Sequence, residues 1–408
     1  MPVPASSSRP RLALQGSDLL GLSRLGFDAT LGIMNVVEHV HHTIASGAGI
    51  IGPVQGDRAR GLTGGIYGIV RGTTRIIGQG LNALVGAFVP PPLAEASTPP
   101  RETMLAVLNG VWGDHLAESG NPLAITSALR VGGLPLDLSQ PLAGQLPDAT
   151  GTVLVLAHGL CMNDLQWTRQ GHDHGQALAR DLGCTPVYLH YNSGRHVSDN
   201  GRELASLLDQ LVAAWPVPVQ RLLIVAHSMG GLVVRSACHV AGKSGQGWLR
   251  HLKKIVFLGT PHHGAPLERG GRLVDTLFGV SPYLAPFSRL SKARSAGITD
   301  LRYGNLQDAD WHGRCRHTQR HDDRRPTPLP PGVRCYVVAA TKGARSTGLH
   351  SRLIADGLVP VASALGEHRD PALALHLPRR HHKVVTGASH WDLLSRQDVY
   401  ALLLSWLR

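Results

Sequence analysis

Residues 222–234 decide the fold of this chain, and they read Leu-Leu-Ile-Val-Ala-His-Ser-Met-Gly-Gly-Leu-Val-Val. An apolar run typical of a buried strand stops at a serine between small residues, and an apolar run typical of a buried helix follows. Ala226 and Gly230, two positions before and after Ser228, would let the strand and the helix pack closely. This pattern predicts that the Ser228 hydroxyl stands at the tip of a sharp turn, with the N–H of Met229 directed at an oxyanion.

A serine hydroxyl is a weak nucleophile, so this interpretation requires a base and an acid that orients the base. Candidates for both follow strand-like segments further along the chain. Asp356 comes after a predicted strand at 333–340, and His390 comes after a short apolar segment at 382–386. Because each of the three residues follows a strand-like segment, the strand ends of a parallel sheet could bring them together. Ser228, Asp356 and His390 are therefore the predicted nucleophile, acid and base.

Several short motifs occur in one order along the chain: His158-Gly159-Leu160, Ala226-His227-Ser228-Met229-Gly230, Gly259-Thr260-Pro261-His262-His263-Gly264, Asp356-Gly357-Leu358-Val359-Pro360 and Ser389-His390. Together they resemble the bacterial lipase and esterase branch of the α/β-hydrolases. The third motif particularly resembles triacylglycerol lipases and the GPI inositol-deacylase-like hydrolases. The resemblance covers roughly residues 150–408, and we recognise no family of known function in the residues before it.

The resemblance implies an α/β-hydrolase fold and a role for each matching residue. Ser228 would be the nucleophile, Asp356 the orienting acid and His390 the base. The backbone amides of Leu160 and Met229 would form the oxyanion hole. This chemistry needs no cofactor and no metal, so none is expected.

Ala226 and Asp392 bear on how firmly these roles can be assigned. Ala226 stands where this family usually has the first glycine of the serine motif, and because alanine is also small, it leaves the assignment intact. Asp392, two residues after His390, is an alternative to Asp356 as the acid. An acidic residue near the histidine can bind calcium in related lipases, but we favour a role for Asp392 at the N-terminal end of a helix.

Strand-like and helical patterns alternate after about residue 150. The strand-like runs lie near 152–157, 185–190, 221–226, 254–259, 333–340 and 382–386, and the helical patterns at 198–214, 229–241 and 393–407. This alternation predicts an α/β fold in which helices cover both faces of a mostly parallel sheet. The site is expected at the carboxyl ends of the strands. Residues 191–195 are expected to line the cleft there, and His262 and His263 to shape the pocket.

Residues 101–408 form the predicted hydrolase domain, with its core from about residue 150. The connection at 265–332 is too long for an ordinary loop, and we interpret it as a cap over the site. The apolar residues of its first half are Leu273, Leu277, Phe278, Tyr283, Leu284, Phe287 and Leu290. Its second half, Trp311 to Arg325, is basic.

His312, Cys315, His317 and His321 in the cap segment have a spacing that loosely resembles a metal site. They lie in a loop rich in proline and arginine, so a solvated loop without a metal is the favoured interpretation. The chain has five cysteines, which imply no disulfide framework, although a pair between Cys315 and Cys335 is left open.

Residues 1–100 are predicted to form a separate helical region rich in glycine and proline. Apolar residues recur at helical spacing between residues 19 and 46 and again between 62 and 88. Glycines at 64, 68 and 72 would let another helix approach closely. We favour a helical pair packed on the hydrolase over a hairpin that lies on a membrane, because glycine weakens helices in water.

The composition limits the partners and the location. The 408 residues carry a net charge of +12, and 5% of them are aromatic. No nucleic-acid-binding motif is present, so we expect no nucleic-acid partner. Peripheral association with an anionic membrane or lipid surface is left open, and a generally basic composition without such a partner is the favoured interpretation. The first residues lack the apolar stretch of a Sec signal peptide, which makes a cytoplasmic location the expectation. The oligomeric state is left open.

The predicted function is hydrolysis of carboxylic esters, as in a lipase or carboxylesterase, through an acyl-enzyme on Ser228. The apolar half of the cap favours medium- or long-chain acyl groups. An acyltransferase, a thioesterase or a polyester depolymerase would use the same three residues, so these remain alternatives. A lipid-binding protein of the same fold without catalysis is the alternative from a different class.

Overall fold

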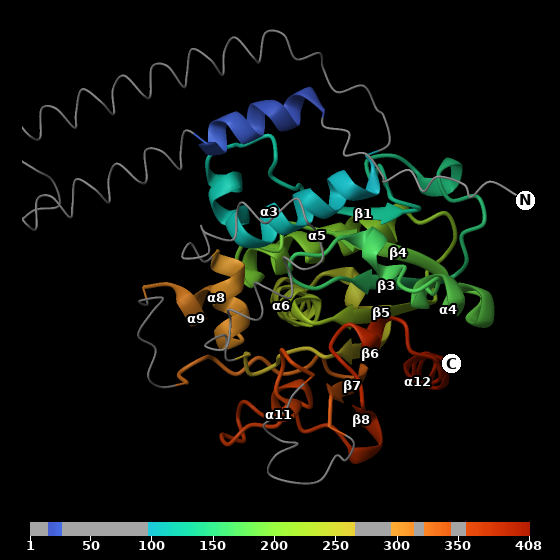
Figure 1. Ribbon diagram of the computed structural model, residues 1–408. Helices are drawn as coiled ribbons and strands as arrows, with labels where there is room; N and C mark the ends of the chain where they lie inside the picture. The colour runs from blue at the N-terminus through green and yellow to red at the C-terminus, as the bar shows by residue number, and fades with distance from the viewer. Residues whose placement is uncertain (1–14, 27–96, 266–294, 314–321, 344–355) are drawn as a thin grey trace, which may run out of the picture. The chain divides into compact units, whose positions relative to one another are not determined.

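The computed structural model of the chain describes residues 15–26, 97–265, 295–313, 322–343 and 356–408 (Figure 1). It divides into two compact units. The first comprises Met1–Arg101 with Glu118–Leu123, and within it residues 16–26 are helical. The second comprises Glu102–Ala117 with Ala124–Arg408, and it contains the sheet.

The second unit is built on a sheet that has eight strands within the described residues, in the order β2-β1-β4-β3-β5-β6-β7-β8. The strands are β1 (Ala128–Val131), β2 (Leu134–Pro135), β3 (Thr152–Ala157), β4 (Thr185–His190), β5 (Arg221–His227), β6 (Leu252–Leu258), β7 (Arg334–Thr341) and β8 (His382–Thr386). The six strands from β4 to β8 in this order are parallel, and β1 and β2 add an antiparallel edge. The prediction of a mostly parallel sheet is confirmed.

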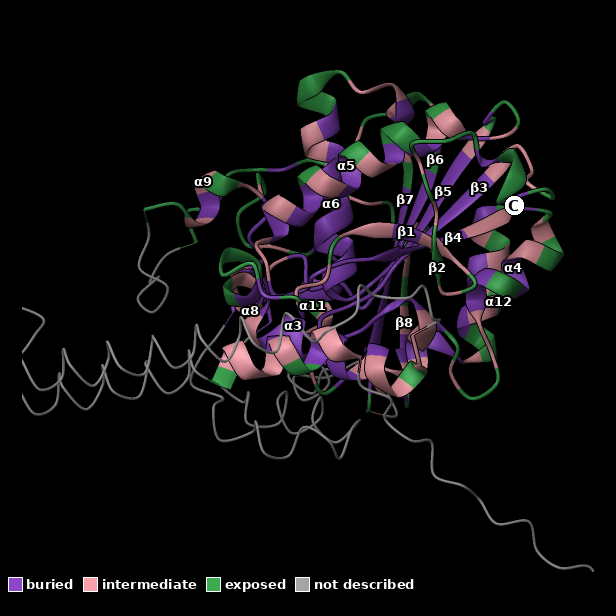
Figure 2. Ribbon diagram, turned by 90° about the horizontal axis from the view of Figure 1, so that it is seen from above, coloured by how far each residue is buried: buried purple, intermediate pink, exposed green. Residues whose placement is uncertain are grey.

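The helices of the described residues are α3 (Pro99–Glu118), α4 (His174–Leu182), α5 (Val197–Ala214), α6 (Met229–Ser244), α8 (Ala296–Tyr303), α9 (Asp308–Trp311), α11 (Val361–Ala364) and α12 (Gln397–Leu407). Side chains of α3, α5 and α6 pack on one face of the sheet, and side chains of α4 and α12 pack on the other. Figure 2 shows the buried strands between these two layers. The central strands are apolar almost throughout because both of their faces are covered.

The strands named from the sequence agree with the structure to within two residues at each end, and two of the three helices to within three. The third differs, because a short 3-10 turn at Asp392–Leu394 precedes α12, which begins only at Gln397. The hairpin of β1 and β2 was not predicted, although Gly132 and Gly133 between its strands are its signal. Both glycines have positive φ, as two-residue hairpin turns require.

Helix α4 was also missed, although its ends carry ordinary signals. Asp173 accepts a hydrogen bond from the N–H of Gln176 and so caps the start of the helix. Gly183 ends it in the left-handed conformation, with φ of 63°. The helix has only nine residues, which is too short for a convincing apolar period in the sequence.

Several predictions lie outside the described residues. These are the helical patterns and the glycine series between 27 and 96, the apolar half of the cap at 273–290, and Cys315, His317 and His321. The described parts of the cap segment carry α8 and α9. None of the helices in the described part of the chain combines the length and apolar character needed to cross a membrane.

Candidate active site

Ser228 lies between the last residue of β5 and the first residue of α6, at the turn that the sequence predicts. Its backbone has φ of 53° and ψ of −125°, a conformation that a residue with a side chain rarely adopts. The first turn of α6, which follows Ser228, packs very closely against the end of β3. A Cβ atom on Gly230 would lie 2.4 Å from the carbonyl oxygen of Ala157 and 2.5 Å from that of His158. Only glycine fits at this position, because both neighbours are backbone atoms of β3 and its extension.

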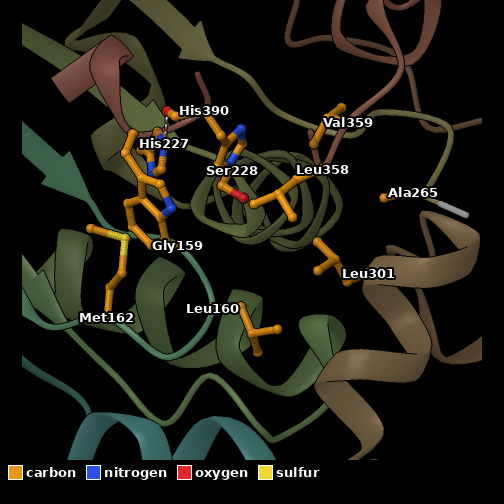
Figure 3. A pocket seen from close by; sticks show the side chains of 11 residues that line it. Gly159, Leu160, Met162, His227, Ser228, Ala265, Leu301, Leu358, Val359 and His390 are labelled. Carbon is orange, nitrogen blue, oxygen red and sulfur yellow. Dashed lines mark hydrogen bonds between the residues drawn. The ribbon is translucent and has the colours of Figure 1, made fainter. Parts of the chain in front are cut away.

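The side chains of Ser228 and His390 point into one pocket (Figure 3). Apart from three polar side chains, those of Ser228, His390 and His227, the pocket is lined by apolar residues and Gly159. The lining residues besides these are Leu160, Met162, Ala265, Leu301, Leu358, Val359 and Trp391. The site therefore offers a hydroxyl and imidazoles in surroundings that would accept an apolar group.

Asp356 and His390 form a buried pair. The Oδ2 atom of Asp356 lies 2.6 Å from Nδ1 of His390, and the two residues are 3% and 2% exposed. The other oxygen, Oδ1, accepts hydrogen bonds from the N–H groups of Leu358 at 2.9 Å and Val359 at 2.8 Å. The carboxylate is thus held on both oxygens. It accepts the Nδ1–H of the imidazole, which leaves Nε2 of His390 with a lone pair.

Asp392 has a different set of contacts. Its Oδ2 accepts hydrogen bonds from the N–H and the hydroxyl of Ser389, both at 2.8 Å. Partial burial raises the pKa of Asp392, but the two bonds from Ser389 together with the charges of Arg169 and Arg396 leave it lowered. Asp392 is the first residue of the 3-10 turn at 392–394, so it stabilises the turn after β8 rather than the imidazole.

Two backbone amides adjoin Ser228. Met229 is the first residue of α6, where helix N–H groups have no partner within the helix. Leu160 lines the pocket, and its neighbour Gly159 is close enough to the serine that a Cβ there would lie 3.0 Å from the Ser228 Cβ. Among the hydrogen bonds of the described residues, none uses the N–H of Leu160 or of Met229. Both donors are thus available to a ligand next to Ser228.

His158 directs one of these amides. Its Nδ1–H donates to the carbonyl oxygen of Gly159 at 2.8 Å, and the N–H of Met162 donates to the same oxygen at 3.3 Å. That carbonyl and the N–H of Leu160 belong to one trans peptide, so they point in opposite directions. Burial lowers the pKa of His158 to about 3, although its bond to Gly159 opposes the shift, and the ring stays neutral.

His227 is a lining residue whose contribution the sequence did not reveal. Its Nε2–H donates to the carbonyl oxygen of His390 at 3.2 Å, and the centres of the two rings lie 4.6 Å apart. Burial, followed by the neighbouring His390, lowers the pKa of His227 well below its ordinary value. A neutral ring thus packs beside the imidazole of His390 and holds its backbone. His227 directly precedes Ser228 in the sequence, and this position was the signal from which a role in the site could have been predicted.

Other predicted positions lie away from the pocket. Residues 191–195 are not among the described residues that line it, so the expectation that they do is wrong. Instead, Tyr191 and Ser193 bond to the turn at 158–161. His262 and His263 are not lining residues either. Instead, the guanidinium group of Arg235 lies 3.4 Å from Nδ1 of His262. The guanidinium group of Arg324 lies 3.4 Å from Nδ1 of His263. These histidines therefore pack against arginines outside the pocket.

The metal and disulfide predictions concern residues that the structure describes only in part. Cys335 is a buried free thiol. A group that the sequence did not suggest is formed by the buried side chains of Glu102, Asp164 and His190, whose potential ligand atoms lie within 4.8 Å of one another. Nη1 of Arg130 lies 3.0 Å from Glu102 and 3.1 Å from Asp164. A guanidinium thus already supplies the positive charge between these carboxylates, which does not favour a metal there.

The family described as the PGAP1-like alpha/beta domain matches residues 148–313, which contain strands β3 to β6 and the turn at Ser228. Together with the parallel sheet and the order of its strands, this match decides the fold. The chain is an α/β-hydrolase by fold. The resemblance to this superfamily and the predicted fold class are both confirmed.

Solved hydrolase structures are similar to this α/β-hydrolase at low identity. The Bacillus licheniformis lipase BlEst2 in its mature form is 18% identical, with a TM-score of 0.39, over 62% of this chain and 91% of that one. The Pyrococcus furiosus esterase Pf2001 is 13% identical, with a TM-score of 0.36, over 64% and 82%. The Legionella pneumophila phospholipase PlaB is 17% identical, with a TM-score of 0.33, over 52% and 44%. No curated protein sequence shows significant similarity to the chain.

Proposed function

We propose that this α/β-hydrolase cleaves carboxylic esters through an acyl-enzyme on Ser228. The observation that supports the proposal is the combination of a strained serine with a buried acid–base pair at one pocket. Ser228 and His390 line that pocket together, and Nδ1 of His390 lies 2.6 Å from Asp356. A structural serine would need neither the strained backbone nor an imidazole held by a buried carboxylate.

In the proposed reaction His390 is the base. Its Nε2 takes the proton of the Ser228 hydroxyl as the oxygen attacks the ester carbonyl carbon. Asp356 keeps the proton of the resting imidazole on Nδ1 and stabilises the imidazolium that forms. The imidazolium then gives its Nε2 proton to the leaving alcohol. In the second half of the reaction, water attacks the acyl-enzyme while Nε2 of His390 takes its proton, and the imidazolium returns a proton to Oγ of Ser228 as the carboxylic acid leaves.

The amides of Leu160 and Met229 are the proposed oxyanion donors. Both lie next to Ser228, and both lack an acceptor among the described residues. Removal of one such donor in other enzymes costs about 3–4 kcal/mol of transition-state stabilisation. The N-terminal end of α6 adds the positive end of a helix dipole at the Met229 side.

The lining of the pocket favours an apolar acyl group. Leu301, Leu358 and Val359 contribute apolar side chains, and the described lining contains no charged side chain besides the titratable imidazoles. Each buried methylene group contributes about 0.8 kcal/mol, so four further carbons would favour binding about 200-fold. We therefore propose medium- or long-chain acyl esters as substrates. Association with an anionic lipid surface, suggested by the net charge of +12, stays a prediction.

Two measurements test the proposal. A fluorophosphonate should label the wild-type protein at Ser228, and mass spectrometry of the labelled peptide identifies the residue. A protein that stays unlabelled while folded would contradict the proposed function and favour a binding protein of the same fold. The ratio kcat/KM on p-nitrophenyl esters from acetate to palmitate then tests the substrate class. A steep fall beyond butyrate would exclude the lipase and leave an esterase for small acyl groups.

A further inference from the structure

The turn that carries the Leu160 amide is only partly held by its own hydrogen bonds, those that Met162 and His158 donate to the carbonyl oxygen of Gly159. Cys161, at the end of this turn, has φ of 58°, a value that favours glycine. The residue is 3% exposed, so water does not satisfy its backbone. Contacts from elsewhere in the fold must therefore hold the turn in place.

Two residues that follow β4 make these contacts. The N–H of Cys161 donates to Oγ of Ser193 at 3.0 Å. The hydroxyl of Tyr191 donates to the carbonyl oxygen of His158 at 2.9 Å. The ring of Tyr191 also stacks on the His158 ring, with centres 4.4 Å apart and planes 23° apart. The turn is thus held at its first residue, at its last residue, and through the imidazole that anchors its central peptide.

The segment that makes these contacts is itself held firmly. β3 and β4 are adjacent parallel strands in which Ala157 pairs with Leu189, so the segments after them meet at one edge. Between the two contact residues, Nδ2 of Asn192 donates to the carbonyl oxygen of Gly113 in α3 at 2.9 Å. The carbonyl oxygen of Asn192 accepts a bond from Nδ2 of Asn200 in α5, also at 2.9 Å. Two helices thus fix the platform on which the turn rests.

We propose that Tyr191 and Ser193 are positioning residues that hold the Leu160 N–H at the place of the developing oxyanion. The proposal rests on the proposed function, because an oxyanion forms only if Ser228 attacks a carbonyl. Neither side chain lines the pocket, so neither contributes to binding of the ground-state substrate. Loss of either hydrogen bond would let the Gly159–Leu160 peptide rotate and weaken the donor only in the transition state.

The variants Tyr191→Phe and Ser193→Ala test this inference in the full chain. Each removes one hydroxyl and keeps the rest of the side chain, and Tyr191→Phe keeps a ring to stack on His158. We expect each to lower kcat on a preferred p-nitrophenyl ester about tenfold, because a donor is loosened rather than removed. KM should stay within about twofold. Inhibition by a trifluoromethyl ketone, which forms an oxyanion adduct with the serine, should weaken by the same factor as kcat.

Matched controls separate positioning from general loss of stability. The Tyr188→Phe variant also removes a buried phenol from β4, but that hydroxyl donates to Asp173 at 2.8 Å on the opposite face of the sheet. The Ser236→Ala variant removes a buried hydroxyl that donates to the carbonyl oxygen of Leu306 at 2.8 Å. Both controls should keep the wild-type kcat, even where they lower the unfolding temperature as much as the test variants do.

The outcomes are separable. If wild-type protein reacts with a fluorophosphonate but both test variants react at the wild-type rate and keep their kcat, the positioning role is wrong and the proposed function stands. If KM rises instead, or if the controls lose as much kcat as the test variants, the two residues are structural only. If folded wild-type protein fails to react at all, both proposals are overturned. Since the two variants break different bonds, a folding failure of one leaves the other as the test.

Discussion

The two amides beside Ser228 come from regions that are organised in opposite ways. In the turn between β5 and α6, the Met229 N–H is oriented by the start of the helix that contains it. In the turn after β3, the Leu160 N–H belongs to a segment that His158, Tyr191 and Ser193 hold by hydrogen bonds. One amide is thus placed by local backbone geometry, and the other lies in a turn held by side chains up to 33 residues away in the sequence.

This difference predicts which part of the proposed oxyanion site is robust to substitution. A helix start needs only a backbone in helical conformation, so many sequences can supply it. The turn at 158–161 depends on particular hydroxyl and imidazole groups, so single conservative substitutions can disturb it. Substitutions in and around the two turns test this difference between a turn set by its own backbone and a turn set by particular side chains.

The largest effect is expected at the turn that the local backbone organises. Ser228→Ala should lower kcat at least about 10⁵-fold, because losses on the order of 10⁶ follow removal of the nucleophile in a comparable triad. The unfolding temperature should stay the same or rise, because alanine removes a buried hydroxyl and leaves the surrounding packing unchanged. Ester hydrolysis by the folded variant, measured with p-nitrophenyl esters, checks this. Turnover within tenfold of the wild-type protein would exclude Ser228 as the nucleophile.

The acid extends the comparison to a second contact between distant segments. Asp356→Asn should lower kcat about 10⁴-fold, since an asparagine favours the wrong tautomer of the imidazole. Asp392→Asn is the matched control. It should cost less than about tenfold, because Asp392 bonds to Ser389 and leaves the His390 ring untouched. Steady-state kinetics on both variants decide between the two carboxylates, and the opposite ranking would make Asp392 the acid.

Alanine substitution of one glycine in each turn allows the two turns to be compared by the free energy of unfolding that each substitution costs. A Cβ on Gly230 would meet backbone oxygens at 2.4 Å and 2.5 Å, which cannot move without shifting β3. A Cβ on Gly159 would meet side chains, with Ser228 Cβ the nearest at 3.0 Å. We expect Gly230→Ala to lower the free energy of unfolding by about 3 kcal/mol or more and Gly159→Ala by about 1 kcal/mol. Urea unfolding measures both, and equal losses would remove the distinction between the two turns.

The last prediction is a pH dependence of stability that both turns share. Each contains a buried neutral histidine: the pKa of His158 is about 3, and that of His227 lies well below its ordinary value. Unfolding exposes both rings, whose pKa then returns to about 6.5, so the unfolded chain binds more protons below that pH. Stability should therefore be full above about pH 6.5 and fall as the pH drops from 6.5 towards 3.

The expected slope is up to about 1.4 kcal/mol per pH unit for each such histidine. Thermal unfolding between pH 8 and pH 4 measures it. His158→Gln and His227→Gln should each reduce the slope, which separates their contributions from those of other groups. A slope that neither variant changes would show that these rings titrate normally in the folded protein.

Sequence patterns predicted the central strands and the turn at Ser228 because these features are local. Residues 153–157 of β3, 222–226 of β5 and 255–258 of β6 are continuous apolar runs, since both faces of a parallel sheet are buried. Features without a local period were missed. The hairpin of β1 and β2 has strands of four and two residues, and α4 is only nine residues long. In each case a glycine or a cap gave the signal, without an apolar pattern long enough to support it.

For the candidate site, the sequence alone determined the order Ser228, Asp356, His390, because chain order and strand ends suffice to place three residues at one edge of a parallel sheet. It could not determine which carboxylate reaches the imidazole. That depended on the 2.6 Å contact between segments 34 residues apart. Nor could it show that residues 191 and 193 bond to the turn at 158–161 rather than line the cleft. Side-chain contacts between neighbouring strands arise only from the tertiary register of β3 against β4, and no single segment of sequence encodes that register.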